Sequence, residues 1–139
     1  MKNILLIDFL IIIFFIVNNV IAKLFDPYGN YSSLRTLLLQ VFEGGLLFGL
    51  PIFVTLIAVV YTFRNSANSH SFEKSLLIPL NYGLFINFVA FINGLVTKQG
   101  DGYGWIFLIL IATSIITFFV SFLINFIIEI FIISRKRSP

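Results

Sequence analysis

The sequence predicts an all-α integral membrane protein, a four-helix transmembrane bundle. Hydrophobic residues make up 59% of its 139 residues and charged residues only 11%, against about 45–50% and 25% in soluble domains. A soluble domain of this size has too little interior to bury so much apolar surface, and the mean hydropathy of +1.05 agrees. Four apolar stretches also reach the roughly 20 residues that a helical span needs. They are continuous rather than alternating, which favours helices over barrel strands.

The four spans are expected at about residues 3–22, 37–63, 76–96 and 105–134, and the whole chain, 1–139, is read as one transmembrane domain. The first span has an alternative interpretation. Its apolar run ends in Val20-Ile21-Ala22 before Lys23, which resembles a signal peptide with a small residue at the cleavage site. If residues 1–22 were cleaved, three spans would remain.

The second span is unusually long and contains a helix-weakening segment. Glu43 precedes Gly44, Gly45 and Gly49, and Pro51 follows. Proline and clustered glycines loosen a helix, so a break or kink is predicted near Gly44–Pro51. Residues 35–45 are then either an interfacial helix joined to a shorter span or the outer part of one kinked helix.

The distribution of basic residues predicts the orientation. If the N-terminus is inside, the inner segments hold Lys2, Arg64, Lys74, Arg135, Lys136 and Arg137. The outer segments then hold only Lys23, Arg35 and Lys98. The excess on the inner side places both termini in the cytoplasm. Asn30-Tyr31-Ser32 in the expected outer loop forms a glycosylation triplet, and nothing else in the sequence marks a eukaryotic source. The expected location is the bacterial cytoplasmic (inner) membrane.

Each span presents one small or polar edge at helical spacing. The clearest is on the fourth span, and Asn87 lies near the middle of the third, where an unpaired amide would be costly. Such edges are typical of seams between packed helices; the functional interpretation is a polar cavity for a solute or a partner helix. The candidate intramembrane site comprises Glu43, Asn87, Ser114, Thr117, Ser121 and Asn125.

Carboxylates near the inner face are a second candidate feature. Asp8 and Glu129 lie close to the inner ends of the first and last spans, and charges in a membrane need partners. Candidate inner-rim ion pairs join them to Arg64 and Lys74. The alternative is a carboxylate pair that handles protons or cations.

Several chemistries are not expected. The chain has no cysteine and a single histidine, His70, which argues against thiolate or histidine-rich metal sites and a bis-histidine haem. No nucleotide-binding glycine loop or Ser/His/Asp set is present. The scattered basic residues suit topology better than nucleic acid. We expect no enzyme, cofactor or nucleic-acid partner.

Two functional hypotheses remain. The first is an accessory, partner-binding or immunity-type subunit that acts without catalysis on another membrane protein. The alternative is a homo-oligomeric pore or small solute or ion transporter with a polar path along the fourth helix. The first expects the polar edge of that helix to be buried within one copy, and the second expects it to line an axis shared between copies.

Overall fold

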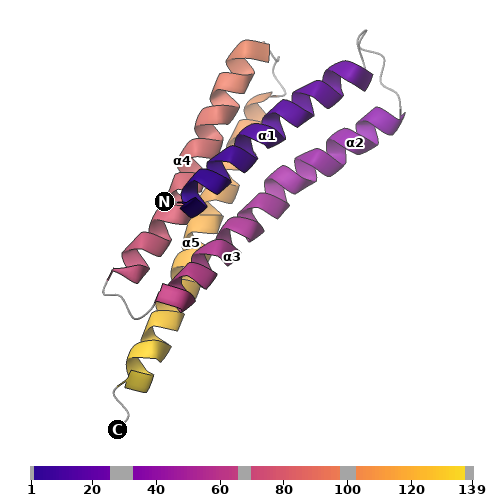
Figure 1. Ribbon diagram of the computed structural model, residues 1–139. Helices are drawn as coiled ribbons and strands as arrows, with labels where there is room; N and C mark the ends of the chain where they lie inside the picture. Colours follow the sequence, from indigo (N-terminus) through magenta and orange to yellow (C-terminus); the bar gives the residue numbers. More distant parts are fainter. Residues whose placement is uncertain (1, 26–32, 66–69, 98–102, 137–139) are drawn as a thin grey trace.

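The structure of the protein, a computed structural model, describes residues 2–25, 33–65, 70–97 and 103–136. All regular structure in these residues is helical, which confirms the all-α prediction. The elements in order are α1 (Lys2–Phe25), α2 (Ser33–Gly44), the π-helical turn η1 (Gly45–Gly49), α3 (Leu50–Asn65), α4 (Ser71–Thr97) and α5 (Tyr103–Lys136) (Figure 1).

Four helices in the described residues are long and apolar enough to cross a membrane: Lys2–Leu24, Gln40–Asn65, Ser71–Thr97 and Gly104–Arg135. Each predicted span falls on one of them. The last is long, because the 34 residues of α5 extend about 51 Å at 1.5 Å per residue. Its C-terminal end extends beyond the other helices (Figure 1).

The helical backbone continues without interruption from Ser33 to Asn65, and the segment singled out by its glycines and proline contains the π turn. Here the Leu50 N–H donates to the carbonyl of Gly45, five residues back. Pro51 has no N–H and its ring collides with the carbonyl four residues earlier; widening the helix by one residue accommodates both effects. Gly45 also faces α1: a Cβ there would lie 3.5 Å from the Phe14 ring. A kink at this turn stays a prediction.

The helices α3, α4 and α5 all pack on one another, whereas α1 lies along α4 and against α2 (Figure 1). The buried apolar residues are Ile7, Ile11, Phe15, Leu46, Leu50, Val54, Ala58, Ile78, Tyr82, Ile86, Ala90 and Leu110. Large apolar side chains also cover the outside; Phe48 is 67% exposed and Phe119 60%. An outer surface this apolar suits lipid better than water.

Candidate functional site

The polar edge of α5 is buried inside the single chain. Ser114 and Thr117 are 7% and 3% exposed, and Ser121 and Asn125 are fully buried. These side chains come from one face of α5, as their helical spacing predicted. That face lies against α3 and α4.

Side-chain hydrogen bonds join α4 to α5 along this edge. Ser71 donates to Glu129 Oε1 at 2.8 Å, and Asn125 Nδ2 donates to Ser75 Oγ at 3.2 Å. A step of four residues forward on α4 thus matches four residues back on α5, as in two antiparallel helices. Further along, Asn87 Nδ2 donates to Ser114 Oγ at 3.1 Å. We call this row of contacts the α4–α5 polar seam.

The remaining two members of the polar edge face different partners. Ser121 Oγ donates to Thr55 Oγ1 of α3 at 3.3 Å, so α3 is also joined to α5 by a polar contact. The Thr117 hydroxyl donates to the carbonyl of Thr113, one turn back on its own helix, at 2.7 Å. Hydroxyl groups in helices can be satisfied locally in this way.

The two helices of the seam approach each other closely at Gly83. A Cβ on Gly83 would lie 3.1 Å from Ser114 Cβ, which is tighter than ordinary packing. The missing side chain lets Asn87 reach both Ser114 and the Gly83 carbonyl, to which its Nδ2 donates at 2.7 Å. Small residues play this part wherever membrane helices pack closely.

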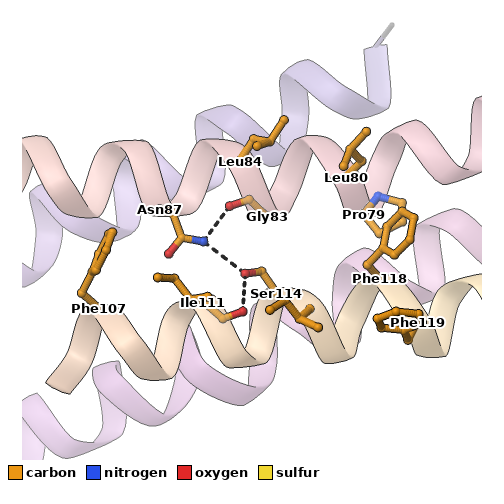
Figure 2. Close-up of a pocket in the computed structure, with 11 residues that line it drawn as sticks. Pro79, Leu80, Gly83, Leu84, Asn87, Phe107, Ile111, Ser114, Phe118 and Phe119 are labelled. Carbon is orange, nitrogen blue, oxygen red and sulfur yellow. Dashed lines mark hydrogen bonds between the residues drawn. The ribbon is translucent and has the colours of Figure 1, made fainter. Parts of the chain in front are cut away.

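A hollow of about 410 Å³ lies beside this close approach (Figure 2). Asn87 and Ser114 supply its polar side chains. The rest of its lining is Pro79, Leu80, Gly83, Leu84, Phe107, Ile111, Ile115, Phe118 and Phe119. Figure 2 shows the Asn87 nitrogen pointing toward Ser114 and its oxygen pointing away. Among the described residues that buried oxygen has no hydrogen-bond partner.

A second polar seam joins α1 to α4 and was missed by the sequence reasoning. Asn81 Nδ2 donates to Asp8 Oδ1, and Asn19 Nδ2 donates to Asn93 Oδ1, both at 2.6 Å. The partners are 73 and 74 residues apart in the chain; this near-constant offset indicates two helices running in the same direction. Helical spacing places Asp8 and Asn19 on one face of α1, but the sequence does not indicate that Asn81 and Asn93 lie opposite them.

The structure gives the two inner carboxylates neutral partners. Asp8 contacts Asn81, and Glu129 contacts Ser71. Within the described residues, neither lies within 4.0 Å of a nitrogen of Arg64 or Lys74, and the salt bridge observed there joins His70 to Glu73 at 3.5 Å with both side chains exposed. Such an exposed pair contributes little stability.

Glu43 does not join the other members of the candidate site. It lies on α2, and its side chain is exposed. In the described part of the chain, no three His, Asp or Glu side chains gather into a group able to hold a metal ion.

Comparison with known proteins adds no further assignment. No family model matches the sequence, and no curated protein or solved structure is significantly similar to it.

Proposed function

We propose that this chain is an integral protein of a bacterial inner membrane, with both termini in the cytoplasm. Its proposed function is to bind another membrane protein as an accessory or immunity-type subunit, without catalysis. Its exterior supports the membrane part of the proposal. Four apolar helices carry large exposed side chains such as Phe48 and Phe119, which would be costly in water.

The observation that carries the choice of function is the burial of the α5 polar edge. A pore built from several copies would turn that edge toward a shared axis. Instead Asn125 and Ser121 are fully buried against α4 and α3 and bonded there. These polar groups are used to hold one copy together, which favours a partner-binding body over a polar conduit.

The hollow between α4 and α5 is the proposed contact point. It is lined by exposed apolar side chains such as Leu84 and Ile115 and by the polar side chain of Asn87. The partner we expect is a transmembrane helix that places a bulky apolar side chain in the hollow. Burial from water does not drive helices together inside a membrane, so they associate through close packing of this kind.

The test is native mass spectrometry of the protein released from its own membrane in mild detergent. We expect a fixed complex with a different chain. Leu84→Trp fills the hollow and should remove that partner, whereas Leu123→Trp is the matched control, since Leu123 is 57% exposed on α5 and lines no part of the hollow. A closed ring of identical copies, or equal loss in both variants, would contradict the proposal.

A further inference from the structure

The inner ends of α1, α3 and α4 enclose a groove that belongs to neither polar seam. Two adjoining hollows of about 810 and 310 Å³ share Asn3 and Tyr61 in their walls. The larger runs between the start of α1 and α3, and the smaller continues toward α4. We call the two together the inner groove.

The lining of the inner groove changes from polar to apolar along α3. Arg64 and Asn65 lie at one end, and Lys74 borders the smaller hollow. The opposite end is walled by Leu6, Phe53, Leu56, Ile57 and Val60. From Phe53 to Arg64 this wall runs about 16 Å along the helix, at 1.5 Å per residue.

The cations at the polar end form no salt bridge with the acids of the described residues. Asp8 and Glu129 are bonded to Asn81 and Ser71. Glu73 faces His70. Among the described residues, no carboxylate lies within salt-bridge distance of Arg64 or Lys74. Asn3 lies in the first turn of α1, and the free N–H groups of that turn also favour an anion.

We propose that the inner groove binds an anionic phospholipid, with its phosphate headgroup between Arg64 and Lys74 and one acyl chain along the apolar wall of α3. Basic pockets between membrane helices on the cytoplasmic side suit such headgroups. The groove joins cations to an adjacent apolar slot, so its chemistry matches a lipid rather than a free phosphate. This proposal rests on the membrane insertion and orientation proposed above.

The test measures binding of phosphatidylglycerol, phosphatidylcholine and inorganic phosphate to the full chain in detergent by native mass spectrometry. We expect phosphatidylglycerol to bind most tightly. Each juxtamembrane cation contributes about fivefold in affinity, so Arg64→Gln with Lys74→Gln should weaken that binding about 25-fold. Lys23→Gln with Arg135→Gln removes the same charge away from the groove and should leave binding unchanged. Leu56→Trp, which fills the apolar slot, should weaken lipid binding while both cations remain.

Three results would overturn the lipid site: equal affinity for phosphatidylcholine, equal loss in the control pair, or competition by inorganic phosphate with no effect of Leu56→Trp. Carbonate extraction of native membranes separates this failure from a failure of membrane insertion. A chain that stays in the membrane pellet but shows no headgroup preference loses only the lipid site. A chain released into the supernatant contradicts the insertion itself.

Discussion

Gly83 on α4 lies so close to Ser114 on α5 that a Cβ at position 83 would stand 3.1 Å from Ser114 Cβ. This contact brings the two helices together beside the hollow and positions Asn87 to bond across the seam. Because the neighbour is a Cβ fixed to the helix, it cannot swing aside as a long side chain would.

Gly83→Ala should therefore destabilise the protein. Overpacking a well-packed contact costs about 1–3 kcal/mol, here through separation of α4 from α5. Gly44→Ala is the matched control, since a Cβ there meets nothing within 4 Å. Thermal unfolding in detergent measures both variants, and equal melting temperatures for the two would show that the close approach is absent.

The bond between Asn125 and Ser75 should show as a coupling free energy. Both side chains are fully buried, and coupling between polar side chains of membrane helices averages about 0.6 kcal/mol, with values up to about 1.7. A double-mutant cycle of Asn125→Ala and Ser75→Ala, followed by unfolding in detergent, measures this coupling. Strict additivity of the two substitutions would rule the contact out.

Removing one partner of the Asp8–Asn81 pair in the α1–α4 seam should destabilise the protein more than removing both partners. Asn81→Leu leaves the Asp8 carboxylate without the donor that bonds it at 2.6 Å. A buried polar group left without its hydrogen-bond partner lowers the free energy of unfolding by about 1–3 kcal/mol, and by more when it is charged. The double variant Asp8→Leu with Asn81→Leu should thus be more stable than Asn81→Leu alone. Chemical unfolding in mixed micelles compares them, and a less stable double variant would contradict the pairing.

The π turn should act as a bending point in the second span. Pro51→Ala restores an N–H donor and removes the ring that opposes a regular α-helix at this place. Spin labels on Val41→Cys and Leu56→Cys, one on each side of the turn, should give a narrower distance distribution in Pro51→Ala than in the parent. Equal widths would show that the turn is not a kink or hinge.

The sequence predicted the all-helical fold and the four long apolar helices because continuous apolar runs carry that information locally. It also predicted the shared face of Ser121 and Asn125, since helical period alone fixes which residues lie on one side. The pairing of those residues with Thr55 and Ser75 was not predictable, because it depends on which helices are neighbours and in what register.

The partners of the inner carboxylates were likewise not predictable from the sequence. Sequence reasoning offered Arg64 and Lys74 as partners because opposite charges attract wherever they meet. The structure instead gives Asp8 an asparagine and Glu129 a serine, since the parallel packing of α1 on α4 brings position 81 to position 8. Only the relative placement of the helices decides between these pairings.

The central claim is that the polar edge of α5 is buried against α4 of the same chain. The chain has no cysteine, so paired substitutions give a clean test, and the 3.1 Å separation is close to the roughly 3.5–4.5 Å between Cβ atoms in a disulfide. Oxidation of Gly83→Cys with Ser114→Cys in native membranes should join the two thiols within one chain, leaving a monomer that no longer reacts with maleimide. Leu84→Cys with Leu123→Cys, on the outer faces of the same helices, should keep both thiols free. Disulfide-linked dimers of the first pair would instead place the polar edge between copies and contradict the account.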